Sequence, residues 1–304
     1  MNILISGGKG FLGKYFYEYW QSKGYSVDSI GRGNKNEIVF DLSKRTPNLS
    51  KEYQYFIHCA GKAHALPQND KEANEFYLVN ENGTKFFLDA ISNQKNKPVG
   101  VLIVSSVSVY GLTFGHLINE KALLKAKDPY GKSKINAEKI AIDWGILNNI
   151  KISIVRLPLV VGKNPPGNLK AMINAIKFGK YFNISGGLAK KSMVLATDVA
   201  EFSFILINIG GIYNLTDSIH PNFNELSKII ANKYGKNNVK NLPIFAAKIL
   251  SVICNLLNNI FKFKIPFNES VINKMISDLT FDDNKARKIG WNPNSVLTNS
   301  HKWL

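Results

Sequence analysis

Three polar side chains in the first half of the chain, Ser106, Tyr130 and Lys134, have the types and the spacing needed to move a proton. Ser105 and Ser106 end an apolar run, and Tyr130 and Lys134 stand four positions apart in a segment with helical character. Residues four apart share one face of a helix, and a nearby ammonium lowers the pKa of a phenol from about 10 towards neutrality. Tyr130 could then exchange a proton near neutral pH, while Ser106 donates a hydrogen bond to the same substrate oxygen.

A glycine-rich segment near the start of the chain, GGKGFLG, predicts a binding site for a dinucleotide. Gly7, Gly10 and Gly13 follow the apolar residues 3–5 and precede a run with helical periodicity. A strand, a glycine turn and a helix in this order present free backbone N–H groups to a pyrophosphate. A Tyr-x-x-x-Lys pair alone is often a solvent-facing helix pair. Joined to this turn and to the two serines, it predicts an active site.

The turn after the second predicted strand bears on the choice between NAD and NADP. An acidic residue commonly ends that strand and holds the ribose 2′-hydroxyl of NAD, but residues 30–33 read Ile-Gly-Arg-Gly. Arg32 suits a 2′-phosphate because a guanidinium makes forked contacts. Asp28 lies earlier, within the strand, in a direction that the sequence does not define. We therefore favour NADP(H), with NAD(H) as the alternative and a plain surface position for Arg32 as the competing interpretation.

The elements that must position these residues alternate between strand and helix. Strands are predicted at residues 2–5, 25–30, 37–40, 55–59, 99–105 and 151–156, and helices at 11–23, 72–92 and 130–148. This alternation predicts an α/β fold with a doubly wound parallel Rossmann sheet. We assign residues 1–165 to a dinucleotide-binding domain and residues 166–304 to a smaller C-terminal substrate lobe, with segments near 194–215 returning to the core sheet.

Composition and charge exclude several classes of protein. With 45% hydrophobic and 20% charged residues, the 304-residue chain is globular rather than disordered. The net charge of +17 comes from dispersed lysines without a nucleic-acid motif, so we predict a solvated basic surface and no nucleic-acid partner. Attraction for anionic substrates or for an acidic membrane face is the weaker interpretation. Two distant cysteines and unpatterned histidines predict no metal site and no disulfide, and His64 is predicted to be a loop residue.

Two segments bear on localisation. The apolar start at residues 3–5 is too short for a secretory leader, so we expect a cytoplasmic protein. Residues 244–261 are apolar, but Lys248 and the asparagines at 255, 258 and 259 interrupt them, which disfavours a transmembrane helix. We predict a helix packed in the lobe and no stable membrane insertion, with a helix lying on a membrane surface as the alternative.

Together these motifs resemble the extended short-chain dehydrogenase/reductase family, in its NAD-dependent epimerase/dehydratase branch, over nearly the whole chain. The resemblance rests on the GxxGxxG turn, Asp41-Leu42, His58-Cys59-Ala60-Gly61, the N-x-x-G-T segment 80–84, the serine motif 105–111, Arg156-Leu157-Pro158, Asn168-Leu169, Asp198-Val199-Ala200 and the tail 281–293.

The resemblance implies site residues of three kinds. The implied catalytic residues are Ser106, Tyr130 and Lys134. Together with Arg32, the cofactor contacts are Gly7, Gly10, Phe11, Leu12, Gly13, Asp41, Leu42, Ala60, Gly61, Asn80, Ser105, Tyr130, Lys134, Pro158 and Val161. The substrate contacts are Lys62, Ser106, Asn168 and Lys191. Lysine stands at 191 where many members carry a phosphate-binding arginine, and lysine lacks the bidentate contact. A homodimer through the Tyr130 helix is also implied.

Within the family the chain looks most like UDP-galactose 4-epimerase-like proteins, and among these like UDP-4-keto-6-deoxy-N-acetylhexosamine 4-reductases of polysaccharide loci. The segment HCAGKAHAL and the apolar residues after Leu242 carry this likeness. It implies a UDP-linked sugar and hydride transfer at C4. Residues 107–109 are Val-Ser-Val, without the Asp-Glu pair of a 4,6-dehydratase. Arg32 favours a reductase over an epimerase with retained NAD. A non-catalytic dinucleotide sensor or scaffold is a further alternative, against which Tyr130 and Lys134 argue.

Overall fold

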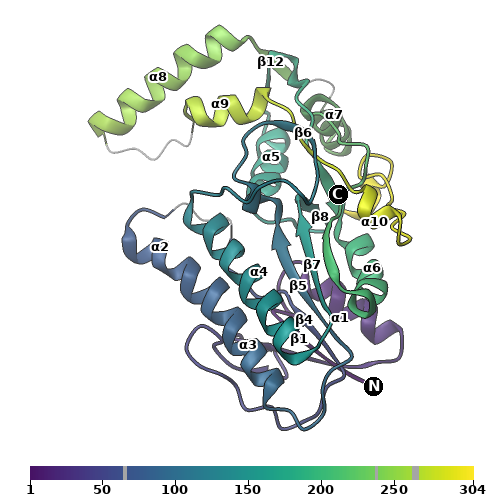
Figure 1. Cartoon of the computed structure of the whole chain (residues 1–304). Helices are drawn as coiled ribbons and strands as arrows, with labels where there is room; N and C mark the ends of the chain where they lie inside the picture. Colours follow the sequence, from purple (N-terminus) through teal and green to yellow (C-terminus); the bar gives the residue numbers. More distant parts are fainter. Residues whose placement is uncertain (64–66, 237–238, 262–266) are drawn as a thin grey trace.

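A seven-stranded sheet forms the centre of the molecule (Figure 1). The computed structural model describes residues 1–63, 67–236, 239–261 and 267–304. The strands, all parallel, follow the order β11-β7-β5-β4-β1-β2-β3. They are β1 (Asn2–Ser6), β2 (Ser26–Gly31), β3 (Ile38–Val39), β4 (Tyr55–His58), β5 (Gly100–Ser106), β7 (Ile152–Leu157) and β11 (Gly211–Asn214). The predicted α/β fold with a Rossmann-type sheet is confirmed.

Helices cover both faces of this sheet, because alternate side chains of its strands point to opposite sides. Ile3 and Ile5 of β1 pack with Phe16 beneath α1 (Gly13–Ser22) and α6 (Ala196–Ile209). Leu4, between them, packs with Phe87 on the opposite face. That second face is covered by α2 (Asp70–Phe76), the π-helical turn η1 (Tyr77–Asn82), α3 (Gly83–Ser92) and α4 (Pro129–Asn148).

The helix predicted at 72–92 is continuous in space but changes its winding. Asn69 caps its start, where the side-chain oxygen accepts a hydrogen bond from the Glu72 N–H at 2.9 Å. Residues Tyr77–Asn82 then wind as a π turn before the α-helix resumes at Gly83. A π turn inserts an extra residue and is frequent at functional sites. Here it carries Asn80, a predicted site residue.

The lobe beside the sheet, which the sequence predicts to bind the substrate, is assembled from paired short strands and helices. Its strands are β8 (Leu159–Val161) with β10 (Met193–Leu195), β9 (Phe182–Ile184) with β12 (Lys240–Leu242), and β6 (Gly115–Ile118) with β13 (Leu279–Phe281). Its helices are α5 (Gly167–Lys177), α7 (Phe223–Lys233), α8 (Ile244–Phe261), α9 (Glu269–Ile276) and α10 (Asn284–Arg287). The 3₁₀ turns η2 (Val107–Tyr110), η3 (Ser185–Gly187) and η4 (Ser300–Lys302) complete the described elements.

The segment near 194–215 behaves in two ways. β11 joins the main sheet beside β7, as predicted. Residues 194–206 do not return to the sheet as a strand, since β10 pairs with β8 outside it and α6 begins at Ala196. Val199, Phe202 and Leu206 are buried at helical spacing and pack against the sheet face. The apolar run is therefore a covering helix, which its length favours.

The helix predicted at 244–261 is present as α8 but is not packed on all sides. Ala247, Ser251 and Cys254 form its buried face, whereas Phe245 and Ile249 are exposed. Figure 1 shows α8 extending from the lobe with α9 alongside it. Within the described residues, no helix combines the length and the hydropathy needed to cross a bilayer.

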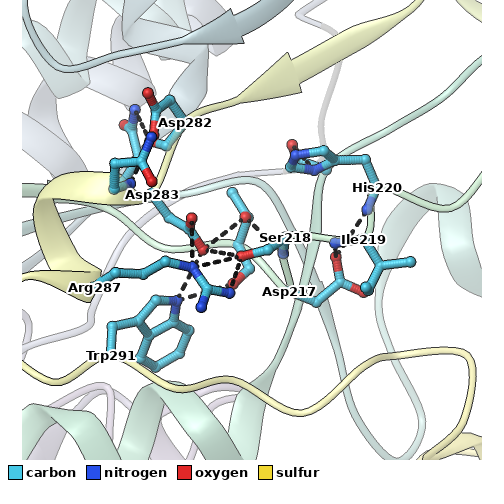
Figure 2. A network of polar contacts seen from close by, with 12 residues as sticks. Asp217, Ser218, Ile219, His220, Asp282, Asp283, Arg287 and Trp291 are labelled. Atoms are coloured by element: carbon cyan, nitrogen blue, oxygen red, sulfur yellow. Dashed lines mark hydrogen bonds and ion pairs between the residues drawn. The ribbon is translucent and has the colours of Figure 1, made fainter.

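A network of polar contacts holds the C-terminal tail against the loop after β11 (Figure 2). The Asp283 carboxylate accepts hydrogen bonds from Thr216 Oγ1 at 3.1 Å, from the Ser218 hydroxyl and from Trp291 Nε1 at 3.2 Å. Asp217, in the same loop, accepts backbone hydrogen bonds, including one from Val296 N–H at 3.1 Å. The tail motif noted in the sequence thus supplies the groups that fasten β13 to the lobe.

Candidate active site

The strand order creates a crevice between β1 and β4. From these neighbours the chain proceeds outwards in opposite directions, towards β3 on one side and β11 on the other. Ligands bind at such a switch point, beyond the carboxyl ends of the strands. A cavity of about 420 Å³ opens there, and it is lined by Gly7, Lys9, Gly10, Gly31, Arg32, Gly33, Asn36, Phe40, Asp41, Leu42, Ser43, Ala60, Gly61 and Val79. Seven of the predicted cofactor residues are among them.

The glycine turn leaves no room for side chains. Gly7 has a φ of +68°, and a Cβ there would lie 2.9 Å from the Cα of Ala60. A Cβ on Gly13 would lie 2.0 Å from the Gly7 carbonyl oxygen. The Gly10 N–H donates to that same oxygen at 2.8 Å and closes the turn before α1. This bare backbone at a helix N-terminus fits the pyrophosphate of a dinucleotide.

Ser6 positions the loop that forms the opposite wall. Its hydroxyl accepts hydrogen bonds from the N–H groups of Cys59 and Ala60 at 3.2 and 3.1 Å, and it donates to Nδ1 of His58 at 2.7 Å. Burial, followed by the charge of Lys134, lowers the pKa of His58 to about 3. The imidazole is therefore neutral and able to accept that bond, which keeps Ala60 at the cavity.

Two cationic side chains line the cavity beside β2 and β3. Arg32 is one, and Lys9 is the other, with its Nζ 2.9 Å from Oε1 of Glu37. Glu37 also accepts hydrogen bonds from the N–H and the hydroxyl of Ser29, both at 2.7 Å. Burial opposes its ionisation, but the bonds from Ser29 and Lys9 prevail and lower the pKa of Glu37 to about 2. Lys9 was not among the predicted cofactor residues, although it stands inside the glycine motif.

Asp28 is engaged with other side chains of the protein. Its carboxylate accepts hydrogen bonds from the hydroxyl of Tyr53 at 2.8 Å and from Lys51 Nζ at 2.9 Å. None of these three residues lines the cavity described above. Asp41 does line it. The pKa of the Asp41 carboxyl is lowered overall. Burial acts to raise it, but the hydrogen bonds from Ser43 and the nearby charge of Arg32 have the larger combined effect.

Ser106 and Tyr130 come together at the carboxyl end of β5. The Asp128 side chain caps α4 by accepting a hydrogen bond from the Gly131 N–H at 3.0 Å, and Pro129 occupies the first turn. The helix therefore begins so that Tyr130 lies in its first turn, within hydrogen-bonding reach of Ser106. The Ser106 hydroxyl also donates to the hydroxyl of Ser108 at 3.1 Å. Ser106 and Tyr130 thus lie close together, as joint donation to one substrate oxygen would require.

The pKa of Tyr130 is raised, which differs from the expectation. Burial is the largest cause, the hydrogen bond from Ser106 acts in the opposite direction, and the charge of Asp128 adds to the rise. Lys134 directs its Nζ to the carbonyl oxygen of Val104 at 2.9 Å, and burial lowers its own pKa. The phenol therefore remains protonated at neutral pH, ready to donate to a stronger base.

Asn80 connects the cavity wall to the catalytic helix. Its Oδ1 accepts from the Lys62 N–H at 2.7 Å, and its Nδ2 donates to the carbonyl of Lys62 at 3.1 Å and to the hydroxyl of Ser133 at 2.9 Å. A Cβ on Gly61 would lie 3.0 Å from Asn80 Oδ1 and 3.3 Å from Lys134 Nζ. Lys134 thus lies directly beside the cavity, and glycine at 61 leaves space for it.

A buried ion pair behind the site was not predicted. Glu138 and Arg156 are 2% and 3% exposed, and Arg156 Nη2 lies 2.7 Å from Glu138 Oε2. Glu138 also accepts a hydrogen bond from the hydroxyl of Ser105, while Arg156 donates to the hydroxyl of Tyr110 at 3.1 Å. The Ser105 hydroxyl is therefore engaged behind β5. The position of Glu138, four residues after Lys134 on the same helix, could have indicated that its carboxylate faces the same side as the predicted catalytic lysine.

Three of the four predicted substrate residues have contacts or positions outside the cavity. Asn168 is exposed in the first turn of α5. Lys191 donates to the carbonyl of Ser277 at 2.8 Å, and burial lowers its pKa to about 8. Lys62 forms an ion pair with Glu75. None of the three lines the cavity beyond β1 and β4.

The remaining predicted cofactor residues differ in how deeply their side chains are buried. Phe11 and Leu12 precede α1, and Phe11 packs edge-on against Tyr15. Pro158 is half-buried, while the Val161 side chain is fully buried in the core of the lobe. His64 lies outside the described residues. No group of three His, Cys, Asp or Glu side chains in the described ranges could hold a metal ion.

Comparison with known proteins agrees with this geometry. Residues 3–215 match the model of the NAD dependent epimerase/dehydratase family. The sterol-4-alpha-carboxylate 3-dehydrogenase (decarboxylating) of Dictyostelium discoideum is 26% identical, with 95% of each chain aligned. The N-acetyl-alpha-D-glucosaminyl-diphospho-ditrans,octacis-undecaprenol 4-epimerase of Escherichia coli O157:H7 is also 26% identical, over 71% of this chain and 66% of its own.

A solved structure shares the fold over almost the whole length. The UDP-glucose 4-epimerase of Thermotoga maritima, solved with UDP-glucose, aligns with a TM-score of 0.75 and 17% identity over 99% of this chain and 96% of its own. The family match spans well over half of the chain and includes the glycine turn, Ser106, Tyr130 and Lys134. The chain therefore belongs to the NAD dependent epimerase/dehydratase family.

Proposed function

We propose that this protein reduces a nucleotide-linked 4-keto sugar at C4, with a UDP-linked sugar as substrate and NADPH as reductant. The observation that carries the proposal is the meeting of Ser106 and Tyr130 at the end of β5, with Lys134 beside Gly61 of the cavity wall. Family membership supports dinucleotide chemistry, and the Escherichia coli relative is named for a 4-epimerase reaction on a diphosphate-linked sugar.

Each of the three residues has its own role in such a reduction. The nicotinamide, when bound, supplies the hydride for the carbonyl carbon. Ser106 donates a hydrogen bond to the carbonyl oxygen and orients it. Tyr130, held protonated by burial, gives its proton to the same oxygen as the alkoxide forms, and the phenolate recovers a proton from solvent. Lys134, four residues after Tyr130 on α4, is expected to supply positive charge to this step.

The preference for NADPH follows from the charges at the adenosine end of the cavity. Arg32 and Lys9 line it, and Asp28 is engaged with Tyr53 and Lys51 instead of facing a ribose. A 2′-phosphate would gain charge-assisted contacts here. At the end of β2, where NAD sites commonly offer an acidic acceptor to the 2′-hydroxyl, this chain has Gly31 and Arg32.

A 4-epimerase with retained NAD is the second candidate, because the named Escherichia coli relative is a 4-epimerase and the same three residues would serve it. A panel of UDP-, dTDP- and GDP-linked sugars and 4-keto sugars, assayed with NADH and with NADPH, separates the two. We expect NADPH oxidation in step with consumption of a UDP-linked 4-keto sugar. Epimerisation of UDP-N-acetylglucosamine without added cofactor would replace the reductase with the epimerase.

A further inference from the structure

Helix α8 carries an apolar face that the rest of the described chain leaves uncovered. Phe245 is 66% exposed, and Ile249, Val252 and Leu256 are each more than half exposed. Their spacing of four, three and four residues places them in one stripe along the helix. Ile244, Leu250 and Ile253 extend the stripe on its flanks. Large apolar residues exposed singly are ordinary, but a contiguous set marks a surface for interaction.

The sequence on both sides of this helix is basic. Between Glu225 and Glu269 the sequence holds seven lysines and no acidic residue. The lysines are Lys228, Lys233, Lys236, Lys240, Lys248, Lys262 and Lys264. Five of them fall in the described ranges. Lys228 and Lys233 lie on α7, Lys236 follows it, Lys240 begins β12, and Lys248 lies on α8. Lysines that flank an apolar helix in the sequence are typical of segments that bind anionic lipid headgroups.

We propose that α8 is a membrane-surface helix, which lies in the headgroup region of an anionic bilayer with the stripe from Phe245 to Leu256 buried in lipid. Interfacial rather than spanning contact agrees with the absence of a spanning helix from the described residues. A second copy of the chain is a poorer occupant of the same face. Two copies meeting there would bring two lysine-rich segments together, and like charges oppose that contact.

Flotation of the full-length protein with lipid vesicles tests the proposal. Vesicles of phosphatidylcholine alone are compared with vesicles that also contain phosphatidylglycerol, at low and high salt. The wild type is expected to float with the anionic vesicles and to be released partly by salt. The double variant Phe245→Ser, Ile249→Ser is expected to lose at least about tenfold in binding, since two exposed apolar side chains leave the lipid.

A matched variant controls for the loss of exposed apolar surface in general. Phe114 and Leu123 are 70% and 69% exposed and lie outside α8, so Phe114→Ser, Leu123→Ser should bind vesicles like the wild type. Equal loss in both variants, or no flotation of the wild type, would overturn the proposal. Equal binding to neutral and anionic vesicles would overturn its electrostatic part. A dimer in solution that only the α8 variant dissociates would assign the face to a second copy.

Discussion

The seven-stranded sheet with its covering helices, here called the sheet half, differs from the lobe in how it holds charged groups. In the sheet half, Glu138 and Arg156 are almost fully buried behind β5 and satisfy each other. In the lobe, Asp283 is buried but its partner Arg287 keeps a side chain that is 40% exposed. A buried pair is costly to break because one charge is left without water, while an exposed pair contributes little. The strand end that carries Ser106 thus depends on one pair, whereas the tail is held by several modest contacts.

The largest expected effect separates a tyrosine of the sheet half from one of the lobe. Tyr130→Phe removes the proton donor and is expected to lower kcat by about 10²–10⁴-fold without unfolding the protein. Tyr181→Phe is the matched change in the lobe, where the hydroxyl has no hydrogen-bond partner within the described part of the chain, and activity should be kept. Steady-state rates with thermal melting curves measure both. An active Tyr130→Phe enzyme would reject the proposed proton donor.

The second test compares the two ion pairs directly. Glu138→Gln leaves Arg156 buried without its counter-charge and is expected to reduce the free energy of unfolding by about 3 kcal/mol. Arg287→Gln in the lobe should cost less than about 1 kcal/mol, because solvent screens that pair. Urea denaturation at neutral pH gives both values. Similar costs would mean that the two halves do not differ as described.

The third test concerns the cationic end of the cavity in the sheet half. Arg32→Ala is expected to raise the Kd for NADPH by about tenfold and to leave NADH almost unchanged. Lys35→Ala removes an exposed cation of the same loop that does not line the cavity and serves as the control. Titration of the reduced nicotinamide fluorescence measures both. An unaltered affinity of the Arg32→Ala variant for NADPH would mean that Arg32 is a surface residue without a part in cofactor binding.

The smallest expected effects are pH dependences of the two halves that have the same sign but fall in separate pH ranges. The pKa of Glu37 is lowered to about 2 from 4.5, so its contribution to stability is complete above pH 4.5 and is lost as the pH falls towards 2. The pKa of Lys191 in the lobe is lowered to about 8 from 10.5, so stability should rise as the pH increases between these values. Glu37→Gln should flatten the acid dependence and Lys191→Met the alkaline one, as measured by urea denaturation across pH. A variant that keeps its wild-type slope would contradict the corresponding assignment.

Local chemistry accounts for most of what could be predicted. The glycine turn, the alternation of strands and helices, and the serine, tyrosine and lysine positions each need only short-range rules, and they led to the parallel sheet and to the meeting of Ser106 with Tyr130. Of the segments near 194–215 that were expected to return to the core sheet, β11 joins it as a strand, whereas α6 covers its face. The length of the apolar run favours a helix, but only packing shows which face of the sheet it covers.

Long-range contacts decided the rest. By itself the sequence determined the fold class, the dinucleotide turn and the identity of the hydroxyl pair, because residue type and spacing restrict the backbone there. Only the tertiary structure decided that Asp28 is engaged away from the cavity, that Lys9 lines it, and that burial outweighs the other influences on the pKa of Tyr130. It also decided that α8 leaves an apolar face uncovered. Each of these depends on which groups from distant segments come into contact, and on how much water remains between them, and neither can be read from spacing along the chain.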